Sequence, residues 1–143
     1  MFMQLGLKAN DKPASRMAGE FIASSEEIKA VYEQSAKKSG GSRTRAYILT
    51  SLKIIYIEIS AVDAFLKCYP LNKKMTYQVE GDKPQNNFAE GIFKAKIQAA
   101  PDASLIFSLD KDRDESDYFT SIKQERQAAH NFIIQLNGLL ARM

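Results

Sequence analysis

The chain has 143 residues but only one cysteine, Cys68, and one histidine, His130. This scarcity excludes an internal disulfide framework and the zinc or iron–sulfur sites that need several cysteines. A cysteine nucleophile assisted by histidine would require these two residues to meet, yet Cys68 lies in a strand-like apolar run and His130 in a helix-like one. We therefore expect Cys68 to be buried packing and His130 to be solvated or capping, with no metal or cofactor.

Long apolar runs and known catalytic motifs are also missing. No segment approaches the roughly 20 apolar residues of a membrane-spanning helix. The first ten residues, MFMQLGLKAN, have neither the basic start nor the small-residue cleavage site of a secretory signal. No serine elbow, phosphate loop or dinucleotide fingerprint occurs, since the Gly40-Gly41 pair lacks a following lysine and helix. These absences favour a soluble, cytoplasmic protein that is not an enzyme.

Acidic residues are absent from one part of the chain and concentrated in another. The net charge is only +3, which is too small to indicate nucleic-acid binding. No acidic residue occurs between Glu33 and Glu58, whereas residues 110–117 read DKDRDESD. The sequence thus predicts one basic end and one acidic loop.

The acidic loop resembles a calcium-binding loop at its start. Asp110, Asp112 and Asp114 occupy the first, third and fifth positions of an EF-hand-type loop. Glu115 then stands where glycine is needed and Ser121 where a bidentate glutamate is needed, so the pattern does not favour calcium. With Lys111 and Arg113 interspersed, we expect an exposed loop.

Alternation of apolar and polar residues dominates from residue 43 onward and predicts short antiparallel strands. The clearest pair covers residues 45–59, RAYILTSLKIIYIEI, with a turn at Thr50 to Lys53. Residues 24–38 fit a helix, with Ser24 and Glu27 as a capping box, or a strand over residues 28–34 that leads into a turn; the strands that follow favour the strand. The further strands that we predict cover residues 65–69, 75–79, 92–99, 105–109 and 118–123.

The end of the chain has a different period. Ala129, Phe132, Ile133, Leu136 and Leu140 are spaced by three, four and seven residues, which predicts an amphipathic helix over residues 125–141. We expect it to cover an open side of the sheets. The chain is short enough for a single domain, residues 23–143, preceded by a partly ordered extension over residues 1–22.

This order of elements resembles the bacterial pleckstrin-homology (PH-like) domains. The resemblance rests on the Thr50 turn between two apolar strands, the proline-led segment at Pro70 and the terminal helix. It implies a mainly β (α+β) fold, a PH-like barrel of two near-orthogonal antiparallel sheets closed by a C-terminal amphipathic helix. It also implies a binding module without catalytic residues.

Two binding functions follow from this resemblance and from the charges. The first is protein–protein interaction or assembly into an oligomer, because antiparallel sheets with open edges readily pair with another strand. The alternative is an anionic membrane lipid or another phosphate ligand, because basic residues beside a glycine turn can surround a phosphate. The candidate residues for that anion are Lys37, Lys38, Arg43 and Arg45. Nucleic acid is the weaker alternative, since the tyrosines alternate with isoleucines as in a packed sheet.

Overall fold

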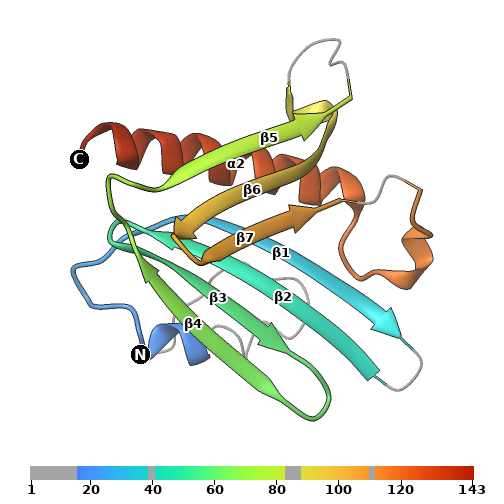
Figure 1. Ribbon diagram of the computed structural model, residues 1–143. Coiled ribbons are helices and arrows are strands. Elements are labelled where there is room, and N and C mark those ends of the chain that lie inside the picture. Colours follow the sequence, from blue (N-terminus) through green and yellow to red (C-terminus); the bar gives the residue numbers. More distant parts are fainter. Residues whose placement is uncertain (1–15, 39–40, 83–87, 110–111) are drawn as a thin grey trace.

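The computed structural model describes residues 16–38, 41–82, 88–109 and 112–143 and shows two antiparallel sheets with a long C-terminal helix (Figure 1). The first sheet has the strand order β1-β2-β3-β4, from Ile28–Lys38, Gly41–Thr50, Lys53–Ile59 and Ala64–Pro70. The second has the order β5-β6-β7, from Thr76–Gly81, Ile92–Ala100 and Ala103–Ser108. Short 3-10 helices, η1 and η2, cover Phe88–Glu90 and Glu115–Asp117, and α2 covers Ile122–Ala141. The expected mainly β fold is confirmed.

The middle of the first sheet, in β2 and β3, is buried on both faces. Its inner face includes Tyr47 and Leu49 and packs against the second sheet and α2 in the main core. Its outer face includes Ile48, Ile55 and Ile57 and forms a smaller core with the segment before β1. Double burial explains the nearly continuous apolar runs of β2 and β3, because alternate residues enter different cores.

The segment before β1 belongs to this outer core. Residues 16–19 form a helical turn, and both Ala18 and Ile22 are buried against the outer face of the sheet. The segment is anchored at the β2–β3 turn, where Thr50 donates its hydroxyl hydrogen to the buried Glu26 carboxylate and Lys53 pairs with it at 3.1 Å. The Thr50 hydroxyl also accepts the backbone N–H of Lys53, which explains why a threonine ends β2.

Residues 118–123 do not form the strand that their alternation predicts. They make only an isolated bridge, Tyr118 to Ala36, and α2 already begins at Ile122. The reason is a capping box: the Ser121 side chain accepts the backbone N–H of Gln124, whose side chain accepts the N–H of Ser121. The predicted apolar stripe of the helix is confirmed, since Ala129, Phe132 and Leu136 are fully buried.

The sheets do not close into the expected barrel. In Figure 1 their strands run in clearly different directions, and no backbone pairing joins the two described sheets. Two backbone carbonyls of β7 accept hydrogen bonds from side chains of the first sheet instead: the Tyr47 hydroxyl donates to the Ile106 carbonyl, and Gln34 donates to the Ser108 carbonyl. At the edge of the first sheet, β4 ends at Pro70, which has no N–H group for further pairing.

No helix in the described part of the chain combines the length and the apolar character that crossing a bilayer requires.

Candidate functional site

The predicted basic residues lie in the last residues of β1 and the first half of β2, but not on one face of the sheet. Lys37 is on the outer face, where its Nζ lies 4.9 Å from the centre of the Phe119 ring. Arg43 and Arg45 alternate with the outer-face residues and therefore lie on the inner face, both exposed. Lys38 pairs with Gly41 through the backbone, and its side chain lies outside the described part. The sheet thus separates Lys37 from the two arginines.

Arg43 lines a pocket between the ends of β2, β3 and β4. The pocket encloses about 400 Å³ and is lined by Arg43, Glu58, Ser60, Asp63, Ala64 and Phe65. Its lining combines one cation, two carboxylates and an aromatic ring, so it is a mixed surface and not a purely anion-binding one.

Glu58 organises the polar side of this pocket. Its carboxylate pairs with Arg43 at 2.8 Å and accepts the Tyr56 hydroxyl at 2.7 Å. Burial and the hydrogen bond to Glu58 raise the pKa of Tyr56 well above its usual value, so this phenol stays protonated as a donor. Arg43 is consequently partly neutralised, which weakens the predicted anion site on this face.

A row of aromatic rings connects the core to the pocket. Phe107, Tyr47, Tyr56 and Phe65 follow one another, with centroid distances of 4.5, 4.9 and 6.1 Å. The row begins in the core and ends at Phe65, which is 53% exposed. A large aromatic side chain that packs on other rings and is still half exposed to solvent is typical of an interaction surface.

Phe65 belongs to β4, whose outer edge faces no further strand in the described sheets. Two hydrogen bonds at the ends of the β3–β4 pair show which residues of β4 face β3. The Ser60 N–H donates to the Asp63 carbonyl and the Leu71 N–H to the Leu52 carbonyl, each at 2.9 Å. Because hydrogen-bonded pairs alternate in an antiparallel ladder, the odd-numbered residues of β4 turn their backbone groups toward β3.

The even-numbered residues of β4 therefore turn their backbone groups outward. They are Ala64, Leu66 and Cys68, followed by Pro70. The first three offer an N–H and a carbonyl each, whereas Pro70 offers a carbonyl only. The accessible edge is thus short and has a defined end.

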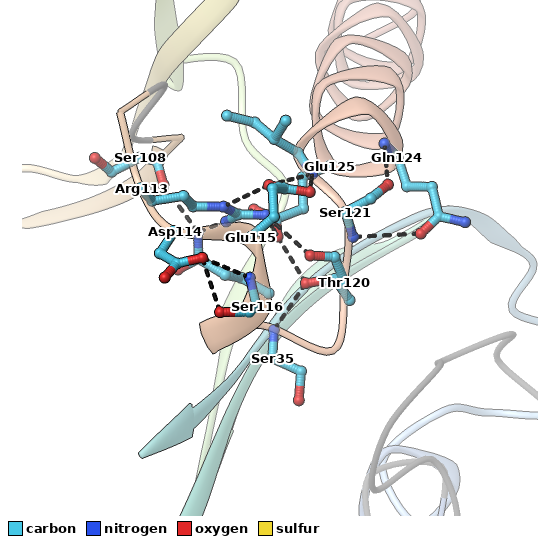
Figure 2. A network of polar contacts seen from close by, with 12 residues as sticks. Ser35, Ser108, Arg113, Asp114, Glu115, Ser116, Thr120, Ser121, Gln124 and Glu125 are labelled. Carbon is cyan, nitrogen blue, oxygen red and sulfur yellow. Dashed lines mark hydrogen bonds and ion pairs between the residues drawn. The ribbon is translucent and has the colours of Figure 1, made fainter. Parts of the chain in front are cut away.

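A second polar cluster lies where the loop before α2 crosses β1, and Figure 2 shows it. Its centre is a buried ion pair: Arg113 is 2.7 Å from Glu125, and their side chains are 3% and 1% exposed. The same carboxylate accepts hydrogen bonds from Thr120, Gln34 and Tyr32. Because its acceptors are occupied by these groups, we interpret the cluster as a clamp that holds the loop and α2 onto β1.

The described acidic residues of the loop are exposed, as expected, but the Arg113 side chain among them is buried. Its guanidinium stacks on the Tyr118 ring, with 3.8 Å between the guanidinium carbon and the ring centre. The exposed carboxylate of Asp114 accepts both the N–H and the hydroxyl of Ser116, and these bonds lower the pKa of Asp114. Asp110, the first residue of the calcium-type pattern, lies outside the described residues. Within the described residues no cluster of three or more metal-ligating side chains occurs.

Sequence reasoning missed the ion pair of Arg113 with Glu125. A signal was present, because Glu125 precedes Ala129 by four residues and so falls in line with the apolar stripe of α2. A carboxylate at such a position requires a buried partner.

Cys68 and His130 do not meet. Cys68 packs against the outer core, whereas α2, which carries His130, contacts the inner core. Burial raises the pKa of the Cys68 thiol, so the thiolate is disfavoured.

In comparisons with known proteins, no family model, no curated protein and no solved structure matches this chain.

Proposed function

We propose that this chain is a non-catalytic binding module with a PH-like fold, and that it binds a protein strand along the outer edge of β4. The strand belongs either to another protein or to a second copy of the chain. The observation that carries the proposal is the register of β4, which turns the backbone groups of Ala64, Leu66 and Cys68 away from β3. An added strand would satisfy these groups, and Phe65 would supply an apolar contact beside them.

Two residues of β4 limit what this edge can accept. Lys67 is exposed on the inner face, and Pro70 ends the row of N–H donors. Lysine and proline on edge strands are common protection against indiscriminate pairing. Here they restrict a partner to a short segment in one register, as a specific binding site requires.

The proposal that the chain is not an enzyme rests on the surroundings of its carboxylates, its cysteine and its histidine. Two buried carboxylates, those of Glu26 and Glu125, are held by Lys53 and Arg113 in structural ion pairs. Cys68 and His130 are on different sides of the first sheet. Neither arrangement leaves a nucleophile beside a base.

Anion binding is the second candidate, and Arg45 is the residue that favours it. Arg45 is exposed in the middle of β2, opposite Gln34 and Glu58 in the strand register. Its neighbour Arg43 is already paired with Glu58, and Lys37 is on the other face. Fewer cations are therefore available to one phosphate than the sequence predicts.

Replacing Leu66 by proline tests the strand-binding proposal. The Leu66 N–H points away from β3, so Leu66→Pro removes a donor from the edge without removing a hydrogen bond from the sheet. We expect the wild-type protein to retain, from an extract of its source cells, a protein that Leu66→Pro does not retain. Circular dichroism would confirm that the variant is folded, and equal retention by both proteins would contradict the proposal.

The Arg43→Gln/Arg45→Gln double variant separates the two candidates. For strand binding, we expect it to retain the same protein as the wild type. For anion binding, it would lose flotation with vesicles of phosphatidylserine and phosphatidylcholine, while Leu66→Pro would float normally. Flotation of the wild type that is lost only in the arginine variant would replace our proposal with the alternative.

A further inference from the structure

The edge of β4 is complementary to itself. Its N–H-bearing outward positions are Ala64, Leu66 and Cys68, arranged symmetrically about Leu66. In an antiparallel pair of two such edges, Leu66 faces Leu66 and Ala64 faces Cys68 on either side of a two-fold axis. Every outward N–H then meets a carbonyl, and Pro70 falls outside the paired segment.

We propose that a second copy of this chain binds there, with β4 paired antiparallel to β4 and Leu66 on the two-fold axis. This proposal rests on the proposed function and names the partner of the same edge. The two four-stranded sheets would join into one continuous sheet across the axis. Because the contact is isologous, each edge is consumed by one partner and the assembly stops at a dimer.

Other registers of the β4–β4 pair would form fewer backbone hydrogen bonds or bring like charges together. Moving the axis toward the end of β4 places Pro70 opposite Ala64, where a donor is missing. Moving it toward the start recruits Val62, which belongs to the β3–β4 turn and not to the strand. A parallel arrangement would bring Lys67 beside its own copy, which like charges disfavour. The Leu66-centred register avoids all three problems.

The side chains support the same register on the outer face of the sheet. Leu66 is half-buried beside the outer core and would meet Leu66 of the second copy. Ala64 would meet Cys68, a small residue opposite a small apolar one. The apolar outer face would therefore continue across the axis without a buried charge.

On the inner face the charges are complementary. Phe65 lies opposite Lys67 of the second copy, and Asp63 lies one position further along the same face. Asp63 and Glu58 both line the pocket beside Phe65. Lys67 of the second copy would thus bring a cation to the aromatic ring and to the acidic side of the pocket. The second copy would complete this pocket.

The native cysteine allows a direct test of the register. In Ala64→Cys, the new cysteine would face Cys68 of the second copy with Cα atoms about 5.5 Å apart, which a disulfide can bridge. Within one chain the two positions are roughly 13 Å apart along the strand, so they cannot bridge each other. We expect mild oxidation of the purified full chain to give a covalent dimer on a non-reducing gel.

Val62→Cys is the matched control, because residue 62 is 89% exposed but out of register with Cys68. We expect its dimer to form at least about tenfold more slowly than that of Ala64→Cys, the effect of a preformed contact worth about 1.4 kcal/mol. Equal rates for the two variants would overturn the proposed register, since exposure alone would then explain the cross-link.

Light scattering of the unmodified protein provides the second measurement. We expect a concentration-dependent mass that reaches twice the monomer mass, a weaker dimer for Lys67→Glu, and recovery in Lys67→Glu/Asp63→Lys, where the charges are exchanged. A wild-type chain that stays monomeric up to millimolar concentration overturns self-pairing. Loss of a captured protein in Leu66→Pro would still support strand binding in that case, so the two failures are distinguishable.

Discussion

Glu125 and Arg113 illustrate how single residues join distant parts of this chain. Glu125 lies in the first turn of α2, yet its carboxylate is hydrogen-bonded to Tyr32 and Gln34 of β1. Arg113 closes the cluster by donating to Glu125 and to the Thr120 carbonyl. Such a pair gives little net stability when complete, but leaving one charge of it alone in the interior is costly.

We expect Glu125→Ala to lower the free energy of unfolding by about 3 kcal/mol, because the buried Arg113 would keep only the half-exposed carboxylate of Glu115, 3.1 Å away, as a counter-charge. Urea denaturation followed by circular dichroism measures this loss. The double variant Arg113→Met/Glu125→Leu is the control and should be more stable than Glu125→Ala, since it leaves no unpaired charge. A loss below about 1 kcal/mol in Glu125→Ala would show that the cluster is solvated rather than buried.

At the scale of elements, the helix α2 is stabilised by its buried apolar residues and by the capping box at its start, and less by its last turn. Ala129, Phe132 and Leu136 are fully buried, and the capping box fixes its first residue. Near its end stands Gly138, where an added Cβ would meet no atom within 4 Å. A glycine in a helix lowers stability because the unfolded chain has more backbone freedom to lose.

We therefore expect Gly138→Ala to raise the free energy of unfolding by about 0.5–1 kcal/mol. Thermal and urea denaturation of the variant measure the gain. Ile134→Ala is a suitable control on the same helix, because Ile134 is 51% exposed and its truncation should change stability little. No gain in Gly138→Ala would indicate that this position is needed for a contact that alanine obstructs.

At the scale of the whole molecule, the first sheet separates two apolar cores. The inner core is enclosed by the second sheet and α2, and the outer core depends on the segment before β1. Ala18 is fully buried in the outer core. The extension that the sequence suggests over residues 1–22 is therefore a structural part of the molecule from residue 16 onward.

Deleting residues 1–22 should expose the outer face of the first sheet and lower stability, because Ile48, Ile55 and Ile57 lose their cover. Denaturation curves and binding of a dye for apolar surfaces would measure both effects. Deleting only residues 1–15 keeps Ala18 and Ile22 and should leave the outer core covered. If the two shortened chains are equally stable, the segment is not the cover that its burial indicates.

Much of the fold follows from local pattern, and the failures have identifiable causes. Alternation located the strands around the Thr50 turn, and the spacing from Ala129 to Leu136 identified the helix. Alternation failed at residues 118–123 because the Ser121 cap starts α2 there. The candidate site was predicted only in part: charge density pointed to Arg43 and Arg45, but the strand period placed Lys37 on the opposite face.

The sequence by itself determined the type and the apolar face of most elements, because periods of two and of about 3.6 residues are local properties of the backbone. Its single cysteine and single histidine also excluded multi-cysteine metal sites, since composition alone limits the ligands that one chain can supply. Only the tertiary structure decided that the sheets stay open, that Arg113 is buried against Glu125, and that β4 is an edge strand of the first sheet. These features depend on contacts between residues far apart in the chain, which no local pattern specifies.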